Sequence, residues 1–385
     1  MIYADYNGSA PLLPSVREHL KQRLDSDIFA NPNAIHSIGQ KISAGLEKCR
    51  QTIADVVGCF HDQIIYNSGS SEGASHILYS VLEFAPANKK VIITSKLEHV
   101  AILKALSYYE EQKHFQVKFV ENDIDGRIRL DHLHNLLSIH QNEVALVTIM
   151  AANNETGVIQ PYLEIARLCT EKKIEYFCDT TQLIGKDDFH FTKSGIDYAV
   201  CSGHKLGALS GTGFIMAKDP TKLSSMVFGS TQERGLRGGT QHYLGVETLA
   251  VAMLDFEKNK TKLSSLKAAR LKFEADMKKD FPKAVIIGSS SDRLPGTTLI
   301  GFPGLHGQAV QIELESHDIF VTTSAACSDN QPETSAVLRA MGVNDELGRS
   351  VIRISLSYSH GEKEYAEIAR VLKSTYNKLG KIHSY

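Results

Sequence analysis

Residues 143–179 read EVALVTIMAANNETGVIQPYLEIARLCTEKKIEYFCD. The apolar runs at the two ends of this stretch, 143–150 and 176–179, have the length and continuity of buried strands, and residues 160–172 have a helical pattern. Parallel strands need such a crossover, and helices laid on both faces bury the strands completely. This unit therefore predicts an α/β fold built on a parallel sheet.

The same alternation extends in both directions, from about residue 37 to residue 215. Further apolar runs are QIIYNS, VIITS, YAVCS and GFIMA, and helical stretches lie near residues 71–84 and 99–111. Residues 37–58 also place apolar side chains at helical spacing, for example at Ile42, Leu46 and Ile53. The prediction is a mostly parallel sheet with helices on both faces.

The pattern changes after about residue 240. Residues 243–282 are predicted to be helical, and the short apolar runs AVIIG, TTLIGF, HDIFVTT and VIRISL follow, with helices between them. A chain of 385 residues is long for one compact core. We predict a large domain over 14–245 and a smaller α+β domain over 1–13 and 246–385.

Composition excludes several classes of function. The formal net charge is −2, with acidic and basic residues interspersed, so direct nucleic-acid binding is not expected. No signal peptide or membrane-length apolar run is present, which favours a soluble cytoplasmic protein. Cysteine and histidine spacing predicts no metal site, and no nucleotide-binding glycine loop or hydrolase motif occurs.

The six cysteines divide into two groups. Five lie in apolar contexts and are expected to be small core residues: Cys49, Cys59, Cys169, Cys178 and Cys201. Cys327 instead lies in the polar segment TTSAACSDNQPETSA, within a predicted loop at about 324–335. An exposed free thiol is a liability unless it has a function, so Cys327 is a candidate reactive residue.

Polar residues follow several of the predicted strands. The turn NSGSSEGASH, with Ser68, Ser70 and Ser71, is either a phosphate cradle at a helix start or an ordinary capped turn. Asp179 ends a buried strand, where it could meet a cationic ligand group or cap the next turn.

Two further strand ends carry basic residues. Lys205 in CSGHK could be a buried nucleophile or a surface lysine, and His99 in SKLEH could act on a ligand or cap a helix.

Taken together, the order and spacing of these segments resemble the class-V aminotransferase family of fold-type I pyridoxal-phosphate enzymes, and within it the NifS/IscS-like cysteine desulfurases. The resemblance covers the chain from about residue 3 to 378. Its most specific segments are TSKLEH, NNETGVIQ, CDTTQLIGK, SGHK, ERGLRGGT, LRAMGVNDEL and IRISLS.

The resemblance implies a role for each candidate residue. Lys205 would bind pyridoxal 5'-phosphate as a Schiff base, His99 would stack on its ring, and Asp179 would hold its ring nitrogen. Arg353 would clamp the carboxylate of L-cysteine, with Asn31 also near the substrate. The remaining implied cofactor contacts are Asn154 and Gln182 at the ring hydroxyl, Ser70, Ser71, Ser202 and His204 at the phosphate, and Thr240 at the phosphate of a neighbouring subunit.

Cys327 lies where this family places the cysteine that accepts sulfur as a persulfide. The implied reaction converts L-cysteine to L-alanine in a homodimer with shared sites, and the sulfur passes to an acceptor protein, for example for iron–sulfur cluster biosynthesis. The chain reads NSGSSE and DYNGSAP where the family commonly reads TSGATE and DYSATTP. The resemblance implies that the standard scaffold docks on a C-terminal extension, and because the sequence ends at HSY we expect a dedicated acceptor instead.

Two other functions remain open at this point. A class-V aminotransferase, or a lyase acting on selenocysteine or cysteine sulfinate, would share Lys205, Asp179 and His99 but would not need Cys327. A non-catalytic scaffold of the same fold would need none of these residues.

Overall fold

The computed structural model describes residues 1–26, 29–323 and 333–382. Its largest sheet has the strand order β2-β8-β7-β6-β5-β3-β4. Strands β7, β6, β5, β3 and β4 run parallel, and β8 runs antiparallel to both of its neighbours. The strands are β2 (Ile64–Asn67), β3 (Val91–Ser95), β4 (Gln116–Val120), β5 (Val144–Thr148), β6 (Tyr176–Asp179), β7 (Tyr198–Ser202) and β8 (Gly213–Ala217).

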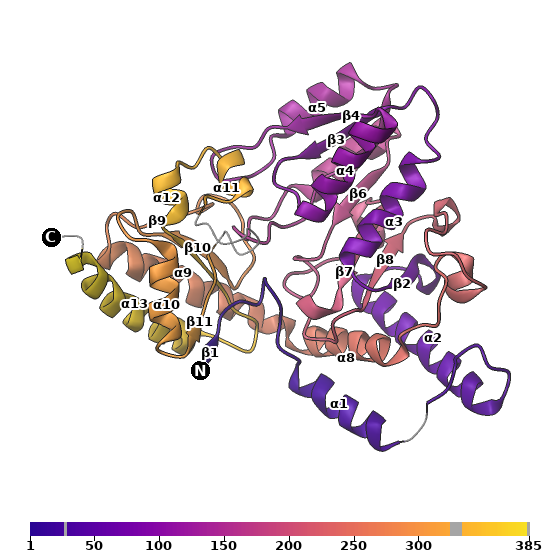
Figure 1. Cartoon of the computed structure of the whole chain (residues 1–385), viewed down its shortest axis with the longest axis horizontal. Coiled ribbons are helices and arrows are strands. Elements are labelled where there is room, and N and C mark those ends of the chain that lie inside the picture. Colours follow the sequence, from indigo (N-terminus) through magenta and orange to yellow (C-terminus); the bar gives the residue numbers. More distant parts are fainter. Residues whose placement is uncertain (27–28, 324–332, 383–385) are drawn as a thin grey trace.

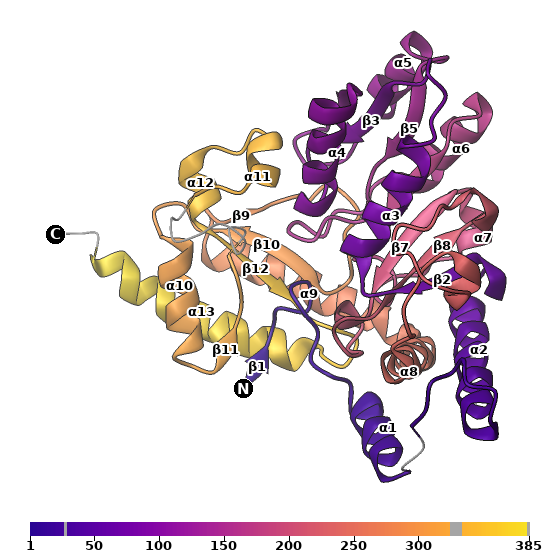
Figure 2. The ribbon, with the colours of Figure 1, turned by 45° about the vertical axis from the view of Figure 1, so that its right-hand side comes forward.

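Helices cover both faces of this sheet because neighbouring strand residues point to opposite sides. Ile92 packs with residues of α3 and α4, whereas Ile93 packs with residues of α2, α6 and α8. Figures 1 and 2 show these helices around the sheet. The helices of this part are α1 (Pro14–Asp25), α2 (Ser37–Val57), α3 (Ser70–Leu82), α4 (Val100–Lys113), α5 (Leu130–Ile139), α6 (Tyr162–Lys172), α7 (Phe191–Ser194) and α8 (Tyr243–Asn259).

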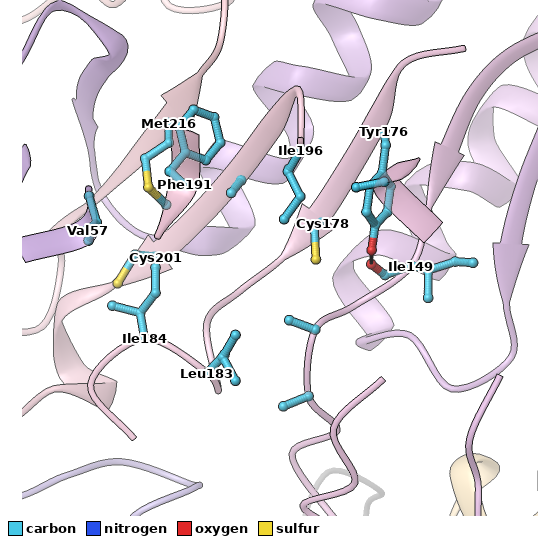
Figure 3. Packing of buried hydrophobic residues seen from close by; sticks show 14 of the residues in the cluster. Val57, Ile149, Tyr176, Cys178, Leu183, Ile184, Phe191, Ile196, Cys201 and Met216 are labelled. Atoms are coloured by element: carbon cyan, nitrogen blue, oxygen red, sulfur yellow. Dashed lines mark hydrogen bonds between the residues drawn. The ribbon is translucent and has the colours of Figure 1, made fainter. Parts of the chain in front are cut away.

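The core between sheet and helices is apolar, with few polar atoms. Figure 3 shows Cys178 and Cys201 among Ile184, Ile196 and other aliphatic side chains. The Tyr176 hydroxyl is fully buried there and donates to the carbonyl of Ile149 at 2.8 Å, so it is not left unpaired.

Cysteine burial follows the prediction only in part. Cys169, Cys178 and Cys201 are buried, as expected. Cys49 and Cys59 are half-buried, although both pack against the same core. Burial raises the pKa of Cys49 to about 11 and of Cys59 to about 12, so neither thiol has thiolate character.

A second, smaller part lies beside the large sheet (Figure 1). Its antiparallel sheet has the order β12-β10-β9, and the N-terminal strand β1 pairs in parallel with β11. The elements are β1 (Ile2–Tyr3), β9 (Val285–Ile286), β10 (Thr297–Gly301), β11 (Ile319–Phe320), β12 (Val351–Ser355), α9 (Leu263–Asp280), α10 (Gly307–Glu315), α11 (Ala336–Ala340), α12 (Asp345–Arg349) and α13 (Glu362–Ile382).

Most predicted elements are confirmed. The strands β1 and β4 and the helices α1, α5 and α7 were not predicted, and β8 is antiparallel because it returns directly from β7 without a crossover helix. The predicted boundary at residue 245 falls inside α8, whose apolar residues pack on the large sheet. The division into domains stays a prediction.

Within the described ranges, none of the helices has the length and apolar character that a membrane crossing requires. The same residues contain no group of three or more His, Cys, Asp and Glu side chains arranged to hold a metal ion.

Candidate active site

A cavity of about 690 Å³ lies where the parallel strands of the large sheet end. Residues that follow β2, β5, β6 and β7 line it, and the small part adds Arg353 of β12 and the turn Asp5–Gly8, called here the N-terminal turn. The carboxyl edge of an open α/β sheet is the usual ligand site of such folds. The predicted site residues that line the cavity are Ser70, Ser71, His99, Asn154, Asp179, Gln182, Ser202, His204, Lys205 and Arg353.

The serine turn forms an uncapped helix start that faces the cavity. Helix α3 begins at Ser70, and its N-cap is Gly69, with φ 144° and no side-chain cap. A Cβ at Gly69 would lie 3.1 Å from Ser202 Oγ, so the glycine keeps the backbone open and close to β7. Free N–H groups at the start of a 13-residue helix are suited to an anion. The alternative of a serine-capped turn is therefore wrong.

An acidic residue, Glu72, lies in the first turn of α3, and its charge is paired with that of Arg237. The Glu72 carboxylate accepts hydrogen bonds from Arg237 at 2.8 and 3.1 Å and from the Ser68 hydroxyl at 2.5 Å. Burial opposes ionisation, but these hydrogen bonds outweigh it and hold the pKa of Glu72 below its usual value. Arg237 thus offsets the negative charge next to the place where an anion would bind.

Asp179 is oriented by a threonine that also reaches the cradle. The Thr181 hydroxyl lies 2.5 Å from Asp179 Oδ1 and 2.6 Å from Ser70 Oγ, and the Thr181 N–H donates to the same carboxylate oxygen. Since a hydroxyl has one proton, Thr181 can donate to the carboxylate while accepting from Ser70. Asp179 lines the cavity, and its hydrogen bonds within the described residues go to Oδ1.

Two histidines, His99 and His204, line the cavity. His99 is the N-cap of α4, and its Nδ1 accepts from the Ala101 N–H at 3.2 Å, so in the neutral ring Nε2 carries the proton. His99 therefore caps the helix and lines the cavity at once. Burial, with Lys205 and Lys186 beside it, lowers the pKa of His204 to about 4, so this ring is neutral.

Lys205 is half-buried rather than on the surface. It ends a short 3-10 turn that directly follows β7, and its Nζ donates to the carbonyls of Asn7 at 2.8 Å and Gly8 at 2.5 Å. Asn7 is buried, and its carbonyl also accepts from Gln182 Nε2 at 2.9 Å. The N-terminal turn thus receives the ammonium of the predicted cofactor lysine.

A second lysine, which the sequence did not indicate as functional, lies in the same network. Lys186 Nζ donates to Asn7 Oδ1 at 2.9 Å and to Gln182 Oε1. Burial, together with the nearby charges of Lys205 and Arg353, holds the pKa of Lys186 well below its ordinary value. Lys186 fixes the orientation of the Gln182 amide, because its donor can face only the amide oxygen.

Arg353 is buried and connects the small part to the cavity. Its Nη1 donates to the Asn154 carbonyl at 2.9 Å, and its Nη2 donates to Asp5 Oδ1 at 2.6 Å. Nε has no hydrogen-bond partner among the described residues. Asn154 thus contributes its backbone carbonyl here, which also accepts from Asn7 Nδ2 at 3.1 Å.

Two buried carboxyl groups, Glu98 and Glu155, lie at or next to the cavity. Glu98 Oε1 accepts from Ser95 Oγ at 2.8 Å and from the Met150 N–H at 3.0 Å, which ties the ends of β3 and β5 together. Burial raises the pKa of Glu98 to about 8. Glu155 lines the cavity, and burial raises its pKa to about 7 against a hydrogen bond from Ser335 at 2.6 Å.

Comparison with known proteins agrees with this geometry. Residues 2–367 match the family Aminotransferase class-V. The chain belongs to the class-V aminotransferase family. It is 32% identical over 361 residues to the cysteine desulfurase NifS of Azotobacter vinelandii, covering 93% of this chain and 88% of that protein.

Solved structures agree as well. A NifS-like protein superposes with a TM-score of 0.88 at 30% identity, covering 98% of this chain and 100% of that one. SspA in complex with cysteine superposes with a TM-score of 0.80 at 27% identity, covering 92% and 99%. These findings confirm the fold, the resemblance to NifS/IscS-like cysteine desulfurases and the pyridoxal-phosphate cofactor of this family member.

The cavity has the donor set that this cofactor needs. An uncapped helix start with Ser70, Ser71 and Ser202 is suited to a phosphate, and a carboxylate and a lysine lie in the same space.

Two predicted residues lie outside the cavity of this chain, and the structure does not describe a third. Asn31 is exposed, and its Oδ1 accepts from the Asn33 N–H. Thr240 is exposed and outside the cavity, so its predicted contact with a neighbouring subunit stays a prediction. Cys327 lies outside the described residues.

Proposed function

We propose that the chain converts L-cysteine to L-alanine with Lys205, Asp179 and Arg353, and transfers the sulfur to Cys327 as a persulfide. The observation that carries this proposal is the convergence of these three described residues on one cavity from β7, β6 and β12. A lysine, a carboxylate and a guanidinium are the groups that an aldehyde, a ring nitrogen and a substrate carboxylate respectively require.

Each described side chain would have a defined task. When bound, pyridoxal phosphate supplies an electron sink for bonds at the substrate Cα. Asp179 would keep the ring nitrogen protonated, and Arg353 would hold the substrate carboxylate. Lys205 Nζ would take and return the Cα proton, and His99 would present its Nε2–H to the reacting groups as a hydrogen-bond donor.

The remaining cofactor contacts follow the same plan. Ser70, Ser71, Ser202 and the neutral His204 would bind the phosphate through hydroxyl, ring and backbone N–H donors. The ring hydroxyl would lie on the side of Gln182 and Asn154.

Sulfur would move to Cys327 in one balanced step. The Cys327 thiolate attacks the substrate sulfur, the S–S bond forms as the C–S bond breaks, and the carbon gains a proton to become the methyl group of alanine. The residues on both sides of segment 324–332 lie near the cavity, which supports this role for Cys327. Thr322 pairs with the backbone of Arg353, and Ser335 donates to Glu155 beside the cavity.

The decisive experiment measures alanine and sulfide from L-cysteine with a reductant, for the wild type and for Lys205→Ala and Cys327→Ser. Equal amounts of both products from the wild type, lost in each variant, are expected. Full activity in Cys327→Ser would exclude it as the acceptor and would favour a lyase. A silent wild type with bound cofactor would point to another substrate.

The protein would work as a homodimer in the cytoplasm and pass sulfur to an acceptor protein, with iron–sulfur cluster biosynthesis as one destination. Exposed apolar side chains on and next to the start of α2 support a subunit contact: Phe29, Ile35 and Ile38. Thr240 would reach the partner's phosphate from such an interface. Equilibrium sedimentation of the holoenzyme tests the subunit number.

A further inference from the structure

We propose that Asp5 is an internal competitor of the substrate carboxylate, and that it sets the affinity of the site for L-cysteine. The proposal rests on the role proposed above for Arg353. It follows from one contact: the only carboxylate bonded to the Arg353 guanidinium in the described part of the chain comes from the protein itself.

The pairing occupies the group that the substrate needs. A carboxylate binds arginine best through two parallel N–H···O bonds. Here Nη2 is bound to Asp5 Oδ1 at 2.6 Å and Nη1 to the Asn154 carbonyl at 2.9 Å, whereas the buried Nε is without a partner. A substrate carboxylate that used Nε together with Nη2 would place its second oxygen beside Asp5 Oδ1 at the same nitrogen, so the two carboxylates would compete there.

The charges lead to the same conclusion. Asp5 and Arg353 both line the cavity, and together they are neutral, so an incoming carboxylate meets a cation that is already compensated. If the substrate carboxylate and the Asp5 carboxylate were bound to Arg353 together, they would repel each other strongly, because the site is partly desolvated. Arg353 is 6% exposed and Asp5 is 25% exposed, so Asp5 is the partner that can move outward.

Gly8 makes the contact possible. A Cβ at Gly8 would lie 2.2 Å from Asp5 Oδ2 and 2.8 Å from its Cγ. An alanine would therefore force the carboxylate away from its present position. The chain has this glycine in the segment DYNGSAP, three residues after Asp5.

The test separates competition from a mere orienting contact. We would measure KM and kcat for L-cysteine with the holoenzyme, and the apparent Kd for cysteamine from the change in cofactor absorbance. Cysteamine has the amine and thiol of cysteine but no carboxylate. The variants are Asp5→Asn, which keeps an acceptor without charge, Gly8→Ala, which displaces the carboxylate, and Arg353→Ala. Asp188→Asn, at a side chain 85% exposed, is the matched control.

Competition predicts that Asp5→Asn and Gly8→Ala each lower KM for L-cysteine by about tenfold, with kcat within about twofold and cysteamine binding unchanged. A raised KM in both variants would show that Asp5 only orients Arg353 and would overturn the proposal. Arg353→Ala should weaken cysteine and leave cysteamine unaffected. If it weakens both equally, the role of Arg353 fails and the Asp5 proposal fails with it.

Discussion

The two sides of the cavity are built in different ways. The sheet edge, formed by Gly69–Ser71, Asp179–Gln182 and Ser202–Lys205, comes from segments at the ends of β2, β6 and β7 of one sheet. The N-terminal turn Asp5–Gly8 and Arg353 instead come from opposite ends of the chain, 348 residues apart at the Asp5–Arg353 contact. The first side is fixed by local sequence, and the second depends on long-range pairing.

This difference has an energetic consequence. Every sheet-edge segment is placed by the strand that it ends or follows, and Asp179 is also held by the nearby Thr181 N–H, although Lys205 and Gln182 bond to the N-terminal turn. The N-terminal turn is held mainly by side chains of other segments, with Asn7 contacting Thr297, Gln182 and Lys186. We therefore expect substitutions at the sheet edge to affect chemistry and those at the turn to affect stability and KM together.

The largest effect is expected at Asp179. Asp179→Asn would remove the charge that keeps the ring nitrogen protonated, and kcat for alanine formation should fall roughly a hundred- to thousandfold. Thr181→Val is the matched variant, because it keeps the carboxylate but removes its hydroxyl partner, and a loss of only a few fold is expected. Equal losses in the two variants would mean that the orientation of Asp179 matters more than its charge.

Asn7→Ala should be the next largest change, and it tests the other side. It deletes the acceptor of Lys186 and the donor to Asn154 and Thr297, all in a buried network. Unpaired buried groups of this kind cost about 2–3 kcal/mol, so we expect a lower free energy of unfolding and a raised KM with a smaller change in kcat. Denaturant unfolding and steady-state kinetics measure both.

Asn33→Ala is the control for that variant, since Asn33 is exposed and its amide bonds only to Asn31 within the described residues. A variant at Asn7 that lost kcat but kept its stability would remove the distinction between the two sides.

The sheet edge was largely predictable from the sequence for a physical reason. Strands with continuous apolar runs are buried, and the polar residues that follow them must lie at one edge, so Asp179 and Lys205 could be named in advance. Antiparallel β8 was missed in orientation, because an apolar run has no direction. The strand β4 was missed because QVKFV is an edge strand, half exposed and without a continuous apolar pattern.

The N-terminal turn could not be predicted in the same way. No local pattern in DYNGSAP indicates that Asp5 pairs with Arg353 or that Asn7 accepts from Lys205, because these contacts arise from the packing of the two chain ends. Lys186, like Lys205, follows a buried strand in the sequence. This pattern alone does not distinguish a buried lysine from a surface lysine, as the two interpretations of Lys205 show. Glu98 and Glu155 were not predicted as site residues, although each is next in sequence to a predicted one, His99 and Asn154.

Glu98→Gln is expected to change the pH dependence of stability. The folded-state pKa of Glu98, about 8, lies above its unfolded value of 4.5, so between these pH values only the folded chain retains the proton. Stability is then lost as pH rises, by up to about 1.4 kcal/mol per pH unit from this group. In Glu98→Gln this loss is absent, so the free energy of unfolding of the variant should rise relative to that of the wild type from pH 5 to pH 8.

Urea unfolding of the holoenzyme across that range measures the difference. Glu111→Gln, at an exposed carboxylate in α4, should run parallel to the wild type. Parallel curves for Glu98→Gln as well would show that Glu98 is ionised in the folded protein.

The smallest effect is expected for Ser335→Ala, at a contact between the small part and Glu155, which follows β5 of the large sheet. Ser335 caps α11 through Leu338 and donates to Glu155 Oε2 at 2.6 Å, so its loss should cost about 1 kcal/mol of stability. Glu155 has a folded-state pKa of about 7, raised by burial and opposed by this hydrogen bond, so without Ser335 it should titrate higher still. Because a raised carboxyl pKa removes stability as pH rises, the cost should be larger at pH 8 than at pH 5. Ser335→Thr should restore both. A cost independent of pH would assign Ser335 to capping alone and would leave the sheet edge and the small part uncoupled at this point.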